Sequence, residues 1–328
     1  MRLSARLMIA GLAFAVAGSV AGCSAGQGLA DAAGAATRPA ARTVTASVPP
    51  RAVAKIAPAT PAGPAIEVTG APRGVKAKAG LLADATTNQV LWADNASAER
   101  PIASIAKVMT ALLIIQAGDL NRKITVPKAV LNYVAEYGAN SAGLVPGQVF
   151  TADELLHALL IVSACDAAYT LATAYGPGLP AFVAKMNAMA AKFGLTHTHF
   201  TSPDGLPYPT EYSTYSTPGD LVKLGELAMR YPEFSSIVGM KLYNLPKGDG
   251  HGHYWWGTTN ELIGYYPGTV GIKTGFTDAA GHCLLFEVVR GGRTLIGVVL
   301  DSPPTGAGAG AQDAAKVLDW GFSLKQSG

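Results

Sequence analysis

Charged residues are scarce in this chain of 328 residues: they make up 14% of it, against 49% hydrophobic residues. This balance excludes an intrinsically disordered protein, because disordered chains combine low hydrophobicity with high charge. No polybasic cluster is present, which excludes nucleic acid as an expected partner. Metal-ligand spacing is also missing, and two histidine pairs, His197 with His199 and His251 with His253, are expected in surface loops. We therefore expect neither a metal nor a cofactor.

Apolar runs of membrane-spanning length are missing at the N-terminal end. The apolar run from Leu7 to Val16 is too short to cross a bilayer, and it follows Arg2 and Arg6, as in an export signal. It leads to Val20-Ala21-Gly22-Cys23, which resembles a bacterial lipobox. Residues 1–22 are therefore predicted to be a lipoprotein signal peptide, with Cys23 as the lipidation site. The alternative is an ordinary secretory signal.

Removal of residues 1–22 takes away two positive charges, which lowers the formal net charge from +3 to +1. The acyl chains would then have to hold the protein on the outer face of the cytoplasmic membrane, because the chain offers little electrostatic attraction to lipid. Residues 23–75 are rich in Ala, Pro, Gly and Thr and have no amphipathic period, so we expect a disordered tether. The folded domain is expected to cover residues 76–328.

Cysteine is rare, with three residues in the chain. With Cys23 assigned to the lipid, Cys165 and Cys283 remain in an oxidising compartment, where they have the opportunity to pair. The fold expected below places both near the same cleft, where a bridge would tie up the motif region. We predict that they do not form a disulfide.

Short apolar runs bounded by turns, together with helical patterns, predict a mixed α/β fold. Turn residues separate two early strands, and Gly291-Gly292 is the kind of two-residue turn that closes a hairpin between two late ones. Thr151 and Glu154 have the spacing of a helix capping box. The result is a five-stranded antiparallel sheet flanked by helices, plus an all-helical lobe, with a cleft between them. Strands are expected at residues 79–83, 89–94, 270–277, 282–290 and 293–300, and helices at 104–117, 155–162, 166–175, 221–230 and 312–322.

Three short motifs occur in order: Ser104-Ile-Ala-Lys107, Ser163-Ala-Cys165 and Lys273-Thr274-Gly275. They match the S-x-x-K, S-D-N and K-T-G set of serine acyl-transferases, apart from one position in the second. Each has an ordinary structural alternative on its own: a capped helix with a solvated lysine, a serine N-cap, and an exposed strand face. Together they fall at a helix start, a helix junction and a strand, which are the contexts that this chemistry requires.

The residue types explain the chemistry. A serine hydroxyl is a poor nucleophile until a nearby base takes its proton, and a spacing of three places Lys107 one helical turn from Ser104. Lys273 would supply a second cation, and Ser163 a second hydroxyl. Gly275 has no Cβ, which lets a ligand backbone lie against its strand.

The chain resembles the D-alanyl-D-alanine carboxypeptidases of the low-molecular-weight penicillin-binding type over about residues 76–302, with a β-lactamase/transpeptidase-like fold. Supporting segments are 103–110, 198–206 and 271–278. The resemblance implies that Ser104 forms an acyl-enzyme with a peptidoglycan stem peptide ending in D-Ala-D-Ala, or with a β-lactam. It also implies that Lys107 is the general base and that Ser163 relays the proton. Lys273 and Thr274 would bind the carboxylate of the substrate, and the N–H groups of Ser104 and Phe276 would form the oxyanion hole.

Cys165 departs from the pattern, because the family usually has asparagine there. A thiol is a weak hydrogen-bond donor and acceptor, whereas an amide does both well. Since some transpeptidase-leaning members resemble this chain in having cysteine there, a DD-transpeptidase is one alternative function. A non-catalytic peptidoglycan-binding homologue is another. A class A β-lactamase is disfavoured, because no Glu-x-x-x-Asn follows Ser163 and residues 186–200 contain no acidic residue.

Overall fold

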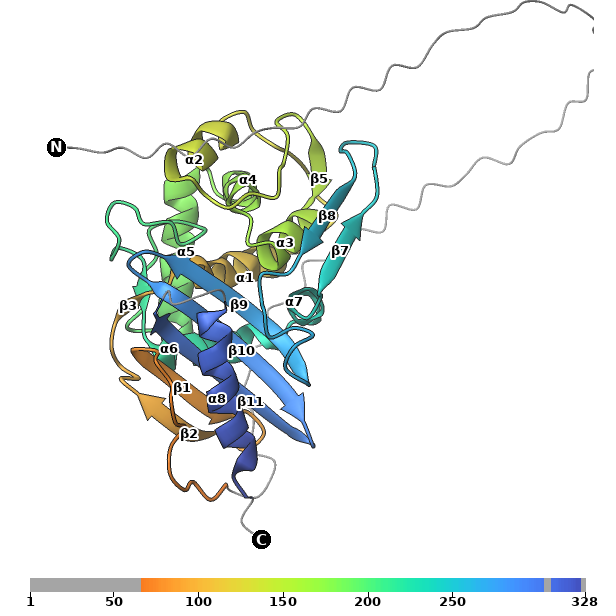
Figure 1. Ribbon diagram of the computed structural model, residues 1–328. Coiled ribbons are helices and arrows are strands. Elements are labelled where there is room, and N and C mark those ends of the chain that lie inside the picture. Colours follow the sequence, from red (N-terminus) through yellow and green to blue (C-terminus); the bar gives the residue numbers. More distant parts are fainter. Residues whose placement is uncertain (1–65, 304–307, 326–328) are drawn as a thin grey trace, which may run out of the picture. The chain divides into compact units, whose positions relative to one another are not determined.

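A five-stranded antiparallel sheet lies at the centre of the structure, a computed structural model that describes residues 66–303 and 308–325 (Figure 1). The strand order is β2-β1-β11-β10-β9. The predicted sheet is confirmed, with early strands pairing with late ones and β9 at one edge. The strands are β1 (Ala79–Asp84), β2 (Gln89–Asp94), β9 (Thr269–Thr277), β10 (Gly281–Arg290) and β11 (Arg293–Ser302).

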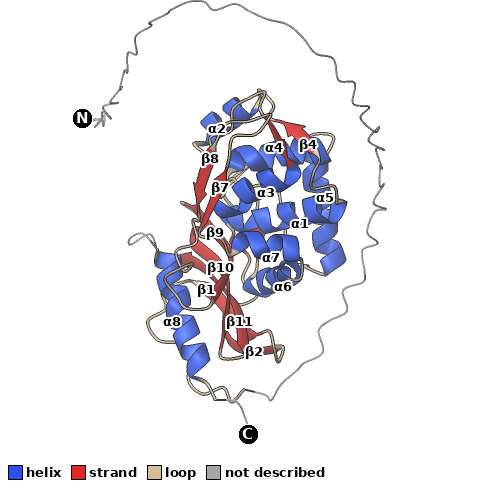
Figure 2. Ribbon diagram, turned by 90° about the vertical axis from the view of Figure 1, so that its right-hand side faces the viewer, coloured by secondary structure: helices blue, strands red, loops and turns tan. Residues whose placement is uncertain are grey.

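Both faces of this sheet are covered, which explains the nearly continuous apolar runs in β10 and β11. Residues such as Leu285 and Val298 face the core shared with the helical lobe, whereas Phe286 and Val299 face a second core under the C-terminal helix. Figure 2 shows that helix on one side of the sheet and the remaining helices on the other. The turn between β10 and β11 has positive φ at Gly291 and Gly292, which glycine adopts at no steric cost.

Helices form the second lobe and cover the sheet. Those expected around residues 104–117, 155–162, 166–175, 221–230 and 312–322 are confirmed as α1, α3, α4, α6 and α8, while α2, α5 and α7 were not predicted. The capping box is present: Thr151 Oγ1 accepts from the N–H of Glu154, and the Glu154 carboxylate accepts from the N–H of Thr151. The helices are α1 (Lys107–Ala117), α2 (Val130–Tyr137), α3 (Ala152–Ile161), α4 (Cys165–Tyr175), α5 (Leu179–Phe193), α6 (Pro218–Met229), α7 (Pro232–Val238) and α8 (Ala309–Ser323).

Three two-stranded sheets complete the described part of the chain, and none was predicted. They pair β3 (Arg100–Pro101) with β6 (Tyr215–Ser216), β4 (Lys123–Thr125) with β5 (Val149–Thr151), and β7 (Leu242–Leu245) with β8 (Tyr254–Gly257). The loop of the β7–β8 hairpin packs on the helical lobe, where the His251 ring stacks on Phe150 at 4.6 Å and its Nε2 lies 3.5 Å from Glu154 Oε1. The expectation of a surface loop is therefore wrong for His251, which is buried, whereas His197, His199 and His253 are exposed.

The domain begins earlier than residue 76. Ile66 is buried; its N–H donates to Gln89 Oε1 at 2.7 Å, and the N–H of Glu67 donates to the carbonyl of Lys325 at 3.0 Å. The predicted boundary at 75 is therefore too late. The predicted signal peptide, Cys23 and the rest of the tether up to residue 65 lie outside the described residues. Within the described ranges, no helix combines the length and the hydrophobicity needed to span a bilayer.

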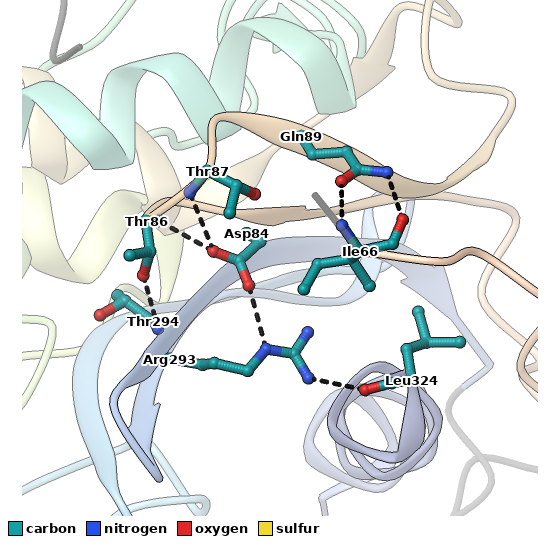
Figure 3. Close-up of polar contacts among 8 residues, drawn as sticks. All are labelled: Ile66, Asp84, Thr86, Thr87, Gln89, Arg293, Thr294 and Leu324. Atoms are coloured by element: carbon teal, nitrogen blue, oxygen red, sulfur yellow. Dashed lines mark hydrogen bonds and ion pairs between the residues drawn. The ribbon is translucent and has the colours of Figure 1, made fainter. Parts of the chain in front are cut away.

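A buried ion pair closes the same end of the sheet (Figure 3). Arg293 Nε lies 3.1 Å from Asp84 Oδ2, and its Nη1 donates to the carbonyl of Leu324 at 3.2 Å. The other carboxylate oxygen of Asp84 accepts from the N–H groups of Thr86 and Thr87. Since Asp84 and Arg293 are both buried, the network ties β1, β11 and the end of α8 together.

Candidate active site

Ser104 lies in a single 3-10 turn, Ala103–Ala106, directly before α1, so the predicted helix starts with a tighter turn than expected. Lys107 is the first residue of α1 and its side chain is fully buried. Its Nζ donates to Ser104 Oγ at 2.8 Å. The three-residue spacing thus brings an amine to the hydroxyl, the relation that activation of a serine requires.

Two further groups surround the Lys107 amine. The backbone carbonyl of Asp204 accepts from Nζ at 2.9 Å, and Cys165 Sγ lies 3.4 Å away. The Asp204 carboxylate is turned elsewhere and accepts from the Tyr133 hydroxyl at 2.9 Å. Burial, first of all, raises the pKa of the Cys165 thiol to about 12, so this group is a neutral thiol at neutral pH. The Lys107 amine is therefore held by uncharged acceptors: a hydroxyl, a thiol and a backbone carbonyl.

Ser163 occupies the junction between α3 and α4, as predicted. It has a positive φ of 62°, a strained conformation for a residue with a Cβ. Helix α4 starts at Cys165, and its N-cap is Ala164, which makes no side-chain cap. The alternative role of Ser163 as an N-cap is therefore wrong, and its Oγ instead accepts from Lys273 Nζ at 2.9 Å.

Backbone contacts on both sides hold this strained residue. The Asn140 carbonyl accepts from the N–H of Cys165 at 2.8 Å, and Asn140 Nδ2 donates to the carbonyl of Val162. The segment that follows Asn140 is fixed by the buried Asp166 carboxylate, which accepts from Ser141 Oγ at 2.6 Å. Asn140 therefore connects Val162, directly before Ser163, with Cys165, two positions after it.

Lys273 lies on β9, with 1% of its surface exposed. Burial is the main cause that lowers its pKa well below the usual value, and the charge of Lys107 acts in the same direction. Besides Ser163, its Nζ donates to the Thr274 carbonyl at 3.0 Å and to Thr274 Oγ1 at 3.4 Å. Each motif lysine thus donates to a motif serine, Lys107 to Ser104 and Lys273 to Ser163.

Two glycines let the motif segments approach closely. A Cβ on Gly275 would lie 2.7 Å from the carbonyl oxygen of Ile102, and one on Gly205 would lie 1.8 Å from that of Ala103. Gly275 was expected to make room for a ligand. In the structure, the absence of a Cβ at Gly275 instead allows β9 to pack closely against the turn that contains Ser104. Both glycines therefore help to set the position of the nucleophile.

A cleft of about 510 Å³ opens above Ser104 and Ser163. Strand β9 lines part of it, and there Phe276 is half-exposed and its ring packs against His282. Cys283 reaches this cleft, while the buried Cys165 lies beside Lys107; both are free thiols, as predicted. The remaining lining residues are Gly138, Asn140, Thr259, Glu261, Thr274, Gly275, Leu284, Gly308, Gly310 and Ala311.

Several residues of the site were not found from the sequence. Asp204 lies in the supporting segment 198–206, but it acts through its backbone carbonyl, so its residue type did not reveal this contact with Lys107. Tyr133 and Asn140 belong to the region around the unpredicted α2. Thr259 precedes β9 in a polar stretch with no motif. Among the described residues, no group of three or more His, Cys, Asp or Glu side chains is arranged to hold a metal ion.

Comparison with known proteins identifies the family of the chain. A family model described as D-alanyl-D-alanine carboxypeptidase, Peptidase S11, matches residues 66–304. The chain belongs to this family. The resemblance drawn from the motifs is thereby confirmed, and so is the expected enzyme class, a serine-type peptidase.

Individual relatives of the carboxypeptidase family cover most of the domain. The D-alanyl-D-alanine carboxypeptidase of Streptomyces sp. strain K15 is 37% identical over 250 residues, 73% of this chain and 84% of the relative. DacB2 of Mycobacterium tuberculosis is 39% identical over 249 residues, 74% of this chain and 81% of the relative. The crystal structure of the Streptomyces K15 DD-transpeptidase has a TM-score of 0.72 at 35% identity and covers 78% of this chain and 100% of that one. These likenesses confirm the expected fold.

Proposed function

We propose that this protein removes the terminal D-alanine from peptidoglycan stem peptides ending in D-Ala-D-Ala, through an acyl-enzyme on Ser104. The observation that carries the proposal is the contact of 2.8 Å between a fully buried lysine amine and the hydroxyl of Ser104. The contact between Lys273 and Ser163 supports it, because a second proton carrier is needed for the leaving group.

In the first half of the proposed reaction, Ser104 Oγ attacks the carbonyl carbon of the penultimate D-alanine while Lys107 Nζ takes the hydroxyl proton. The N–H groups of Ser104 and Phe276 stabilise the oxyanion. The C–N bond then breaks, and Ser163 relays to the departing amine of D-alanine the proton that Lys107 has taken, which returns Lys107 to its neutral form. In the second half, water adds to the ester, with Lys107 as base, and restores the Ser104 hydroxyl.

A β-lactam would acylate the same hydroxyl, because its ring carbonyl takes the place of the scissile carbonyl. We expect a fluorescent penicillin to label the wild-type protein covalently and to leave Ser104→Ala unlabelled. Release of D-alanine from a diacyl-D-Ala-D-Ala peptide is expected to disappear in the same variant. Labelling that persists in Ser104→Ala would show that another residue is the nucleophile. Absence of both activities from the wild type would favour the non-catalytic peptidoglycan-binding function.

Transfer to an amine is a second candidate function, and Cys165 favours it. In place of an amide, the thiol gives weak hydrogen bonds beside the catalytic lysine, which alters how the acyl-enzyme and its acceptor are held. A structural relative bears the name DD-transpeptidase. The two functions are separated by adding an acceptor amine and measuring both free D-alanine and cross-linked peptide. If most of the acyl-enzyme ends as cross-linked peptide, the protein is a transpeptidase.

We also propose that Cys23 carries a diacylglycerol and holds the protein on the outer face of the cytoplasmic membrane. The support is the Val20-Ala21-Gly22-Cys23 sequence after the apolar run. Radiolabelled palmitate is expected to be incorporated into the wild-type protein. The variant Cys23→Ala is expected to incorporate no label and to be absent from the membrane fraction. A Cys23→Ala protein that keeps the label would contradict the assignment.

A further inference from the structure

The loop of residues 202–206 is attached to α1 at two successive carbonyls. The Pro203 carbonyl accepts from Thr110 Oγ1 at 2.6 Å, and the Asp204 carbonyl accepts from Lys107 Nζ at 2.9 Å. Thr110 and Lys107 lie one turn apart on this helix, and both are buried. A shift of the loop would therefore redirect the lysine amine, which must be aimed at the nucleophile to act as its base.

The side chain of Asp204 is a buried carboxylate, with 1% of the residue exposed. Its Oδ2 accepts from the Tyr133 hydroxyl at 2.9 Å, and its Oδ1 accepts from the N–H of Leu206 at 3.2 Å. A carboxyl group that accepts on both oxygens is held in its ionised form. No ion pair among the described residues includes Asp204. Because burying a charge without a direct ion pair is unfavourable, stability alone does not explain this carboxylate.

The charge of Asp204 acts on the surroundings of the Lys107 amine. Asp204 contacts that amine through its own carbonyl, so its carboxylate lies close by. The thiol of Cys165, 3.4 Å from the same amine, responds to both charges. Burial, first of all, raises the pKa of this thiol; the charge of Lys107 lowers it, and the charge of Asp204 raises it again. The amine and the carboxylate are therefore close enough to influence one shared neighbour.

Positive charge also acts on Lys107. Burial first, and then the charge of Lys107, lower the pKa of Lys273 on β9, so each amine disfavours the protonated form of the other. The other titratable groups around Lys107 are the thiol of Cys165 and the hydroxyl of Tyr133. Burial, as the first cause, raises the pKa of both, so both are neutral at neutral pH. When Lys107 takes a proton from the nucleophile, the carboxylate of Asp204 offsets the repulsion.

We propose that Asp204 and Tyr133 are positioning residues for the general base. Asp204 directs the amine of Lys107 with its backbone carbonyl and stabilises the protonated lysine with its carboxylate, while the Tyr133 hydroxyl holds that carboxylate in place. Tyr133 is itself held by neighbouring rings, with centroids 5.5 Å away in Tyr137 and 4.8 Å away in Tyr169. This inference rests on the proposed function, in which Lys107 takes the proton of the nucleophile.

The rate of acylation by a fluorescent penicillin, measured from about pH 5 to about pH 9, tests this inference. Asp204→Asn keeps the shape of the side chain and removes its charge. Its plateau rate is expected to fall about tenfold, and the pH of half-plateau to move down by about one unit, because the amine then holds its proton less tightly. Asp204→Glu keeps the charge and is expected to keep the wild-type pH of half-plateau.

Two tyrosine variants separate the hydroxyl from the ring. Tyr133→Phe keeps the charge of Asp204 but loses the bond that holds it, so acylation is expected to slow about threefold or more, with the pH of half-plateau within about 0.3 units of the wild type. Tyr169→Phe is the matched control, because its ring belongs to the same cluster and the described bond to Asp204 comes from Tyr133. Its rate is expected to stay within about twofold of the wild type.

The pH of half-plateau reports only on molecules that react, so partial unfolding lowers the rate without moving it. An unmoved pH of half-plateau in Asp204→Asn overturns the role of the charge. If that variant yields no folded protein, the comparison of Tyr133→Phe with Tyr169→Phe decides, and equal rates overturn the inference. A wild type that no penicillin acylates would overturn the proposed function and this inference with it. A wild type that reacts, beside variants that behave like it, overturns this inference alone.

Discussion

Glu287 of β10 is a buried carboxyl group, with 9% of its surface exposed. Burial first, and then the negative charge of Glu226 on α6, raise its pKa from 4.5 to about 7. Burial also raises the pKa of Glu226. The substitution Glu287→Gln keeps the shape of the protonated side chain and removes its titration, so it isolates the free energy of burying this charge.

The sign of the effect follows from proton binding. Between pH 4.5 and about pH 7, the folded protein holds a proton on Glu287 that the unfolded chain has lost. Stability contributed by the protonated carboxyl is therefore complete below pH 4.5 and is lost as the pH rises through about 7. The interval between the two pKa values corresponds to about 3 kcal/mol of unfolding free energy.

Urea unfolding followed by tryptophan fluorescence measures this difference. At a pH of about 8, Glu287→Gln is expected to be more stable than the wild type by about 2–3 kcal/mol; at about pH 4.5 the two are expected to agree within about 0.5 kcal/mol. Glu226→Gln serves as the matched control and is expected to reduce the pH dependence of the wild type only in part, because its charge is the smaller cause. An equal stability difference at both pH values would refute the reasoning.

Three further changes test other parts of the molecule. Gly205→Ala places a Cβ 1.8 Å from the Ala103 carbonyl at a φ of 82°, and is expected to slow penicillin acylation at least about tenfold; normal acylation would mean that the nucleophile turn tolerates the shift. Asp84→Ala leaves a buried guanidinium without its partner and is expected to lower the free energy of unfolding by about 3–5 kcal/mol in urea, whereas a loss below about 1 kcal/mol would contradict the network. The thiol of Cys165, with a pKa of about 12, is expected to react with iodoacetamide about tenfold faster for each unit of pH between about 7 and 10, as followed by mass spectrometry; a rate independent of pH would contradict its protonated state.

The sheet and the three motifs were predictable because their signals are local. The apolar runs bounded by turns, the Gly291-Gly292 turn and the Thr151 capping box each depend on a few neighbouring residues, and the structure confirms them. Helix α5 had a readable signal as well: Phe182, Met186 and Ala190 are buried at a spacing of four. Its many alanines make that pattern faint, which explains why the helix was missed.

The rest of the site depends on contacts between distant segments. The Asp204 carbonyl reaches Lys107 across 97 positions, and the carbonyl of Asn140 holds the N–H of Cys165, so both act through backbone atoms that carry no residue-specific signal. The space at Gly275 has the same origin, since only the assembled fold brings the Ser104 turn against β9. Sequence therefore identifies the reacting groups, and packing determines what holds them.

The start and end of the described domain meet at one corner, where Glu67 donates to the carbonyl of Lys325 and Ile66 is gripped by Gln89. A mechanical pull on the chain ahead of Ile66 would load this corner first, and the nearby Asp84–Arg293 pair would share the strain. None of these bonds involves the Ser104 turn. Tension would thus separate the edge strand β2 from the sheet before it displaced Ser104 and Lys107.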